Sequence, residues 1–356
     1  MRITRLEISK LDLKLQAALT VAYGSYAELN YALVKVHTDS GMIGLGEASP
    51  DPQVTGETQE SVFLALHEMS NLLVDKDPMD VVPLLAECRK RYMAYPAALA
   101  AIDMALYDLA GQSLGVPVYQ LLGSKARSEV GLYPVVPLDE PDVMAGVALQ
   151  FIGMGARMLK VKLGTKPEED LRRLQAIRNT VGSEIVLRLD INQGWQDAET
   201  AISAIRQLED FNVAYIEQPV RDDDLKGMAE VSAAVDLPIM ADESCHTAED
   251  VLKIACMHAA DMINIKLMKC GGIYEAGRML AVAEAAGLPC ILGSMGESSI
   301  GSAAGLHFVV SHPSVTACEL IGPLFITNDP ATGFEVDMAR MSAIPSELPG
   351  LGVRLI

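Results

Sequence analysis

Basic residues and long apolar runs are both scarce in this 356-residue chain. It has 28 lysines and arginines against 47 aspartates and glutamates, which gives a formal net charge of −19. A protein that binds nucleic acid or anionic membrane surfaces normally needs a basic face, so the shortage of cations argues against both classes. No run approaches the roughly 20 apolar residues of a membrane span. The N-terminus alternates polar and apolar residues and has no apolar signal core. We therefore expect a cytoplasmic protein without nucleic-acid or membrane partners.

Several motifs for cofactors and nucleophiles are also missing. The six cysteines form no C-x-x-C pair and the six histidines form no H-E-x-x-H motif, so the sequence does not indicate a zinc site. There is no G-x-G-x-x-G segment, no P-loop and no G-x-S-x-G elbow. Nucleotide-dependent and serine-nucleophile chemistry are therefore not supported. The cysteines lie mostly among apolar residues and are expected to be reduced core residues.

The apolar residues predict a large folded core. They make up 50% of the chain, which excludes intrinsic disorder. A chain of this length suggests about two domains, although one α/β barrel uses about 250 residues by itself.

Residues 1–125 have the pattern of an α+β domain, with strands first and helices after them. The expected strands are 3–15, 31–38 and 42–48, and the expected helices are 58–73, 81–93 and 97–114.

From about residue 126 the pattern becomes a regular alternation of short apolar strands and amphipathic helices. Eight strands are expected, near residues 133, 160, 189, 216, 241, 264, 291 and 318. Eight such units predict a (β/α)8 barrel over residues 126–325, with a doubly wound sheet as the alternative. Because residues 126–325 already contain all eight expected strands, the tail, 326–356, is not expected to add a strand to the barrel. It is expected to pack back on the N-terminal domain.

Three acidic residues end three consecutive strands of the predicted barrel. Asp190, Glu217 and Asp242 would meet at the C-terminal face, where barrel enzymes have their active sites. Three converging carboxylates repel one another unless a cation holds them, and oxygen ligands suit a hard divalent ion, here predicted to be Mg²⁺. The alternative is that these acids are solvated loop charges paired with lysines. Their equivalent positions on successive strands favour the metal site.

Lysines interrupt two further strands. Lys160 and Lys162 are two residues apart and lie on one side of the second strand, whereas Lys266 belongs to the sixth strand, across the barrel. Lys162 and Lys266 would face each other as catalytic bases, with Lys160 and the metal lowering the pKa of Lys162. This arrangement suits proton abstraction from a carbon next to a carboxylate, with the metal stabilising the enediolate. The alternative is an ordinary pair of surface lysines.

These segments strongly resemble the enolase superfamily, in its muconate-lactonizing-enzyme-like subgroup. The resemblance covers essentially the whole chain and rests on LKVKLG, LRLDINQGW, YIEQPV, IMADES and INIKLMKCGG. It implies a capping domain of residues 1–125 completed by 326–356, above a modified barrel. It also implies Mg²⁺ on the three strand-end acids, acid/base catalysis by Lys162 and Lys266 with help from Lys160, and a homo-oligomer.

Within the subgroup the sequence looks most like the dipeptide epimerases, which invert the C-terminal residue of a dipeptide. Those enzymes usually carry Asp-x-Asp at the end of strand eight to hold the substrate's ammonium group. Here Glu319 is followed by Leu320 and Ile321, an ending that looks like the muconate cycloisomerase type. Glu319 or Glu297 would then have to bind an amine alone.

Specificity is expected to come from two candidate lid loops of the capping domain, 19–26 and the segment around 53–57. The first contains no arginine or lysine, so we predict that an anionic dipeptide is disfavoured relative to an apolar or cationic one. The candidate substrate contacts are Tyr26, Thr55, Asn192, Glu297, Ser298 and Glu319.

Three functions remain open from the sequence. The first is an epimerase or racemase acting by 1,1-proton transfer on a dipeptide or an N-acylamino acid. The second is a lyase on the same scaffold, either a cycloisomerase or a dehydratase. Two lysines on opposite faces favour the first, since a syn β-elimination needs a base on one face only. The third is a catalytically silent barrel that serves as a binding or scaffold protein.

Overall fold

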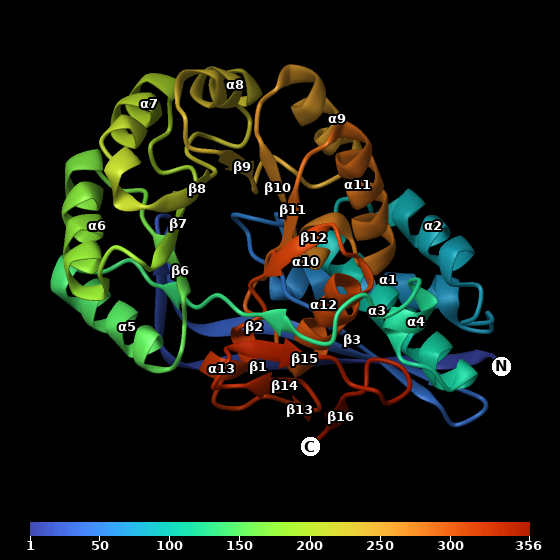
Figure 1. The fold of residues 1–356 in the computed structure, drawn as a ribbon. Helices are drawn as coiled ribbons and strands as arrows, with labels where there is room; N and C mark the ends of the chain where they lie inside the picture. Colours follow the sequence, from blue (N-terminus) through green and yellow to red (C-terminus); the bar gives the residue numbers. More distant parts are fainter.

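The computed structural model describes residues 1–356 and begins with an antiparallel sheet covered by helices (Figure 1). The three strands pair in the order β1-β2-β3. Their bounds, and those of the helices that follow, are β1 Ile3–Val21, β2 Gly24–Thr38, β3 Ile43–Ala48, α1 Gln59–Leu73, α2 Val81–Tyr92, α3 Pro96–Leu114 and the short α4 Val118–Leu121. We call this part the cap.

Local chemistry explains these elements. Thr58 and Ser61 form a reciprocal capping box at the start of α1. Helix α3 begins at Pro96 and ends at Gly115, whose φ of 71° lies in the left-handed region. A side chain at Gly46 would place its Cβ 1.9 Å from the carbonyl oxygen of Ala101, so only glycine lets β3 approach α3 this closely.

The segment 19–26 is a hairpin tip and not the expected loop. Strand β1 continues to Val21, Ala22 and Tyr23 form a two-residue turn, and Leu19 pairs with Tyr26. The regular pairing is interrupted between Lys14 and Leu19. At the tip, the carbonyl of Thr20 accepts from the backbone N–H of Leu138 at 2.9 Å, which ties the hairpin to the barrel.

The remaining chain forms the predicted barrel of eight parallel strands. They follow one another in sequence order from β5 to β12. Their bounds are β5 Val135–Val136, β6 Met158–Lys162, β7 Val186–Asp190, β8 Val213–Glu217, β9 Ile239–Ala241, β10 Met262–Ile265, β11 Cys290–Leu292 and β12 Val315–Cys318. A parallel bridge between Leu132 and Cys318 joins the two ends of the sheet. The predicted fold class, a barrel with an α+β capping domain, is confirmed.

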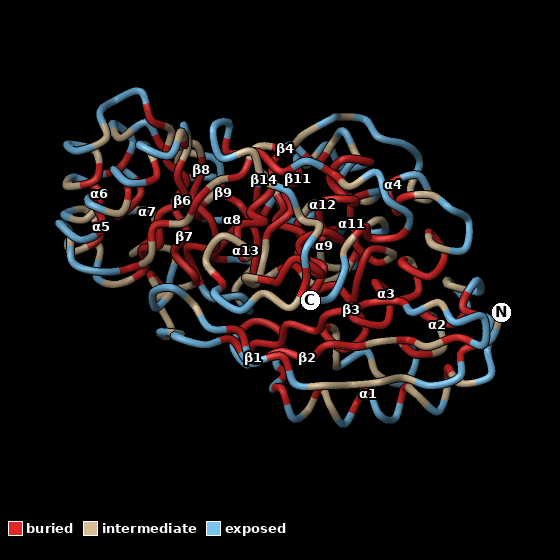
Figure 2. The backbone as a smooth tube through the Cα atoms, turned by 90° about the horizontal axis from the view of Figure 1, so that it is seen from below, coloured by how far each residue is buried: buried red, intermediate tan, exposed pale blue.

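Helices surround the barrel on its outer side (Figure 1). They are α5 Pro141–Gly153, α6 Pro167–Val181, α7 Ala198–Arg206, α8 Leu225–Ala234, α9 Ala248–Met257, α11 Ile273–Ala286 and α12 Ser299–Ser311, with the short η1 Glu209–Phe211, α10 Leu267–Cys270 and α13 Gly322–Phe325. One apolar cluster of 92 buried residues runs through both the cap and the barrel, so the two parts share a core. Figure 2 shows this buried backbone passing from one part into the other.

The tail returns toward the cap, as expected. The backbone N–H of Thr327 donates to the carbonyl of Lys14 at 2.9 Å, and Ile326 forms a bridge with Leu15. The tail contains the short strands β13 Ala331–Thr332, β14 Glu335–Asp337, β15 Ser342–Ile344 and β16 Arg354–Leu355, and β15 pairs with β4 Val130–Gly131. The division into 1–125 with 326–356 and 126–325 stays a prediction, since the tail also contacts β4.

Three buried carboxylates of the cap hold the N-termini of helices. Asp103 accepts from the backbone N–H groups of Ile273 (2.7 Å) and Tyr274 (3.0 Å) at the start of α11. Glu47 accepts from Ser298 N at 3.0 Å and from Gly301 N at the start of α12.

Glu57 does the same within the cap, where it accepts from Ala97 N at 2.8 Å and Ala98 N at 3.2 Å. We call Glu47, Glu57 and Asp103 the helix-capping carboxylates. Burial raises the pKa of each to about 7, against the lowering effect of the N–H donors.

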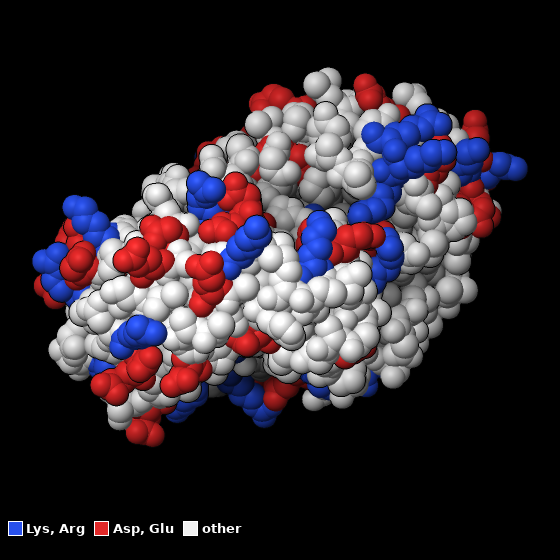
Figure 3. Space-filling model, turned by 90° about the horizontal axis from the view of Figure 1, so that it is seen from above, with Lys and Arg blue, Asp and Glu red and all other residues white.

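None of the helices is long and apolar enough to cross a membrane. All six cysteines are free thiols, and only Cys256 is exposed. On the face seen in Figure 3, basic side chains lie among acidic ones. Cytoplasmic location stays a prediction.

Candidate active site

The three predicted acids converge at one edge of the barrel. Asp190 and Glu217 end the paired strands β7 and β8, and Asp242 comes directly after β9. All three are fully buried, and one carboxylate oxygen from each lies within 4.8 Å of the others. The parallel register of the strands produces this convergence, because it aligns their carboxyl ends. We call these three residues the acid triad.

Lys160 lies among the acids as a buried counter-ion. Its Nζ is 2.9 Å from Asp190 Oδ2, 2.8 Å from Glu217 Oε2 and 2.9 Å from Glu319 Oε2. Burial by itself would lower the pKa of Lys160, but the three carboxylates outweigh it and hold that pKa well above its ordinary value. Lys160 is therefore a permanent cation beside Lys162.

The other two lysines contact different members of the acid triad. Lys162 Nζ lies 2.7 Å from Asp190 Oδ2 and 2.9 Å from Asn192 Oδ1. Lys266 Nζ lies 2.7 Å from Asp242 Oδ2. Both lysines line the same cavity. A substrate bound in this cavity would have the ammonium group of Lys162 on its Asp190 side and the ammonium group of Lys266 on its Asp242 side.

The donor set of the acid triad fits a divalent cation. All of its ligand atoms are carboxylate oxygens, which suit Mg²⁺. Acceptors also exceed donors around it: Glu243 Oε2 and Glu319 Oε1 are buried and have no hydrogen-bond partner. Burial, with the charges of Asp242 and Asp190, raises the pKa of Glu243 to about 7. Such a surplus of buried carboxylate is what a cation would relieve.

Two supporting residues escaped the sequence analysis. Lys269, fully surrounded by protein, donates to the side chain and the backbone carbonyl of Asp242. Asn264 Nδ2 donates to Glu217 Oε1 at 2.9 Å. Lys269 follows Lys266 by three residues on the one-turn helix α10, so helical spacing in INIKLMKCGG could have identified it.

The candidate substrate contacts divide into two groups. Tyr26, Asn192 and Glu319 line the cavity. Thr55, Glu297 and Ser298 do not, and their polar groups are used elsewhere.

Thr55 bonds within the turn that begins at Asp51. Glu297 accepts from Met295 N at 3.0 Å and from the hydroxyl of Ser294. Ser298 is the N-cap of α12 and donates to Glu47. These bonds give all three side chains a role in the fold, and their part in binding substrate stays a prediction. Glu57, expected in a lid loop, instead caps α3.

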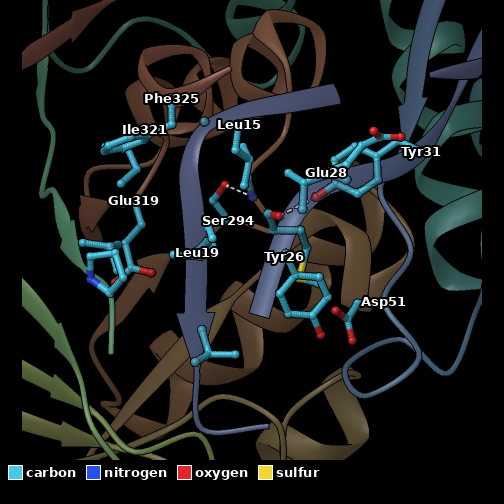
Figure 4. A pocket seen from close by; sticks show the side chains of 18 of the residues that line it. Leu15, Leu19, Tyr26, Glu28, Tyr31, Asp51, Ser294, Glu319, Ile321 and Phe325 are labelled. Atoms are coloured by element: carbon cyan, nitrogen blue, oxygen red, sulfur yellow. Dashed lines mark hydrogen bonds between the residues drawn. The ribbon is translucent and has the colours of Figure 1, made fainter. Parts of the chain in front are cut away.

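The cavity has a volume of about 850 Å³ and lies between the cap and the barrel mouth. Two of its walls differ in character (Figure 4). Asp12, Tyr26, Glu28 and Asp51 line what we call the acidic arm, and no ion pair occupies these acids. The second, the apolar arm, is lined by six residues: Leu15, Leu19, Phe151, Ile321, Leu324 and Phe325.

Family comparisons agree with this architecture. Residues 5–123 match the mandelate racemase / muconate lactonizing enzyme N-terminal domain, and residues 144–356 match the enolase C-terminal domain-like family. The N-succinyl-L-Arg/Lys racemase of Bacillus cereus is 39% identical over 100% of this chain and 96% of its own length. Its crystal structure superposes with a TM-score of 0.97 and covers 100% and 96% of the two chains.

Two epimerases are similar over their whole lengths. The hydrophobic dipeptide epimerase of Enterococcus faecalis is 36% identical, over 99% of both chains, and its complex with Mg and L-Leu-L-Tyr has a TM-score of 0.95. The L-Lys-D/L-Arg epimerase of Methylococcus capsulatus is 33% identical over 99% of both chains. With its cap, its barrel and its acid triad, this chain belongs to the mandelate racemase / muconate lactonizing enzyme family of the enolase superfamily.

Proposed function

We propose that this protein is a Mg²⁺-dependent racemase or epimerase that inverts the α-carbon of an amino acid whose nitrogen is acylated. The C-terminal residue of a dipeptide is one such amino acid. The observation that carries the proposal is the placement of Lys162 and Lys266 at different ends of the acid triad, with both ammonium groups lining one cavity. Two bases on two sides of one carbon can remove a proton and return it with inversion.

The residues divide the work as follows. Asp190, Glu217 and Asp242 would hold Mg²⁺, which when bound stabilises negative charge on the substrate carboxylate. Lys162 or Lys266, in its neutral form, takes the α-proton, and the opposite lysine in its ammonium form returns a proton to the other face. Lys160 keeps its charge and adds positive potential beside Lys162. A syn β-elimination needs a base on one face only, so the presence of two lysines favours racemisation over a lyase reaction.

The acidic arm supports a cationic side chain on the inverted residue. Asp51 is buried and lines the cavity without an ion pair, Glu28 lies near Tyr26 in Figure 4, and Asp12 also lines the cavity. The Tyr26 hydroxyl lies beside Asp51, and burial together with that carboxylate raises the pKa of Tyr26, so it stays a hydrogen-bond donor. No lysine or arginine in 19–26 is available for an anionic side chain. Two of the relatives are named for arginine and lysine substrates.

The residues that follow β12 bear on which of two classes of acyl group the substrate carries. A dipeptide brings an ammonium group, for which Glu319 Oε1 is a free acceptor. An N-acylamino acid brings no charge there, and two observations favour it: Glu319 Oε2 is already paired with Lys160, and Ile321 supplies no second acid. We retain both substrates, as N-acyl and dipeptide forms of one reaction.

The test is a substrate panel in heavy water with Mg²⁺, followed by NMR and chiral analysis. We expect deuterium at the α-carbon together with inversion, and higher kcat/KM for N-acyl-lysine or Ala-Lys than for L-Ala-L-Glu. Asp51→Asn should lower kcat/KM for lysine substrates about tenfold and change leucine substrates little, whereas the exposed control Asp39→Asn should change neither. Equal or better turnover of L-Ala-L-Glu would contradict the cationic preference, and exchange in no substrate would contradict the reaction itself.

A further inference from the structure

The apolar arm of the cavity has no role in the chemistry described so far. Its six residues carry no charge, and Ile321 and Phe151 are almost fully buried in its wall. The rings of Phe151 and Phe325 meet edge to face with centroids 6.0 Å apart. In Figure 4 Ile321 and Phe325 lie on the side of Glu319, away from Tyr26 and Asp51, and Leu15 and Leu19 lie on the strand between the two sides, where Leu19 pairs with Tyr26.

The arm is a built part of the fold. Its cap wall is the interrupted stretch of β1, and its barrel wall is α13, which follows β12. Gln16 Nε2 donates to the carbonyl of Leu324 at 3.0 Å, and Leu15 bridges to Ile326. These bonds tie the two walls together, so the apolar surface is held in place before a ligand arrives.

Resting on the proposed function, we propose that the apolar arm binds the acyl group of the substrate, and that this group is an uncharged aliphatic chain of about four to six carbons. The α-hydrogen must face a lysine and the carboxylate must face the acid triad, which leaves two substituents of the α-carbon for two arms. The acidic arm attracts the cationic side chain. The apolar arm then takes the acyl group, since placing a cation among Leu15, Ile321 and Phe325 would desolvate it without a partner.

The absence of a cation in this arm makes the inference specific. A distal carboxylate, as in an N-succinyl group, would lie against Leu324 and Phe325 with no lysine or arginine among the six lining residues. Butanoyl and succinyl groups have four carbons each and differ by that carboxylate. The arm therefore predicts that butanoyl is preferred to succinyl.

The experiment measures kcat/KM and calorimetric affinity of the Mg²⁺-loaded enzyme for N-acetyl-, N-butanoyl-, N-hexanoyl- and N-succinyl-L-lysine. Each added methylene should improve affinity about threefold, and the four methylenes from acetyl to hexanoyl therefore about 80-fold, mainly through KM. Succinyl should bind at least about tenfold more weakly than butanoyl. A flat series, or a preference for succinyl or for a free-ammonium dipeptide, would overturn the assignment of the arm.

Phe325→Ala and Phe334→Ala form a matched pair of half-buried phenylalanines, of which only Phe325 lines the cavity. Phe325→Ala should reduce the hexanoyl-to-acetyl ratio at least about fivefold, whereas Phe334→Ala should leave the ratio as in the wild type. Equal ratios in both variants would contradict the inference. If the α-proton exchanges but kcat/KM does not depend on acyl chain length, the assignment of the apolar arm is wrong and the proposed reaction stands. If no N-acyl substrate exchanges, the proposed reaction fails, and the calorimetric series still decides what the arm binds.

Discussion

Two sets of buried carboxylates, in two regions of the molecule, meet opposite surroundings. The acid triad at the barrel mouth is surrounded by lysines, and Lys160 with Lys162 helps to bring the pKa of Asp190 down to about 2 although burial acts against it. The helix-capping carboxylates accept from backbone N–H groups and hydroxyls, and burial raises their pKa to about 7. Burial alone therefore does not identify a functional acid. Clustering with other acids and with buried lysines does.

The largest expected effect concerns the lysines that contact the acid triad, since the helix-capping carboxylates have no such partners. Lys162→Ala and Lys266→Ala should each lower the rate of inversion by at least about a thousandfold while leaving the fold intact. Each variant should still exchange the α-proton of one substrate enantiomer, measured by NMR in heavy water. Lys166→Ala, at an exposed position shortly after β6, is the control and should retain activity. Full epimerisation by both active-site variants would refute the two-base mechanism.

The next prediction separates the two sets by their response to metal. Mg²⁺ should raise the melting temperature of the wild type by a few degrees, and chelation should abolish its activity. Asp242→Asn should lose this metal-induced shift. Asp103→Asn should keep the shift but unfold at a lower temperature, because α11 loses a charged acceptor at its N-terminus, a loss of about 1–2 kcal/mol. An equal Mg²⁺-induced shift of the melting temperature in both variants would contradict the distinction between the two sets of carboxylates.

The smallest effect is a difference in pH dependence. The pKa of Glu47 in the folded protein, about 7, exceeds its ordinary value of 4.5, so the folded state holds a proton that the unfolded state releases. Its stabilising contribution is complete below about pH 4.5 and is lost as the pH rises to about 7. The lowered pKa of Asp190 works in the other direction, at acid pH.

Glu47→Gln should therefore flatten the fall in unfolding free energy between pH 5 and 8 by about 1–3 kcal/mol. Urea titrations at each pH would measure this change. The exposed Glu335→Gln is the control and should leave the profile as in the wild type. An unchanged slope in Glu47→Gln would show that this carboxyl does not titrate in that range.

The sequence predicted what depends on local pattern. The eight barrel strands were visible as short apolar runs, and Asp190, Glu217, Asp242 and the lysines stood out because they interrupt those runs at equivalent points. Barrel topology then placed them together without further information.

The rest depends on contacts between distant segments. Glu47 and Ser298 are 251 residues apart in the chain, and no periodicity links a strand-end glutamate to a helix that begins in the barrel. The bond between Ser298 and Glu47 could therefore not be predicted from the sequence. The apolar arm has the same origin, since β1, α5 and α13 form it jointly, and none of them shows it alone.

The capping of barrel helices by carboxylates of the cap also constrains how this enzyme can be recombined. The cap supplies the acidic arm and one wall of the apolar arm, which makes it an attractive module to exchange between relatives. Glu47 and Asp103, however, each complete a helix of the barrel, α12 and α11. A grafted cap without them would leave two helix starts open beneath the active site, so a working chimaera must inherit these two acids before any residue that selects the substrate.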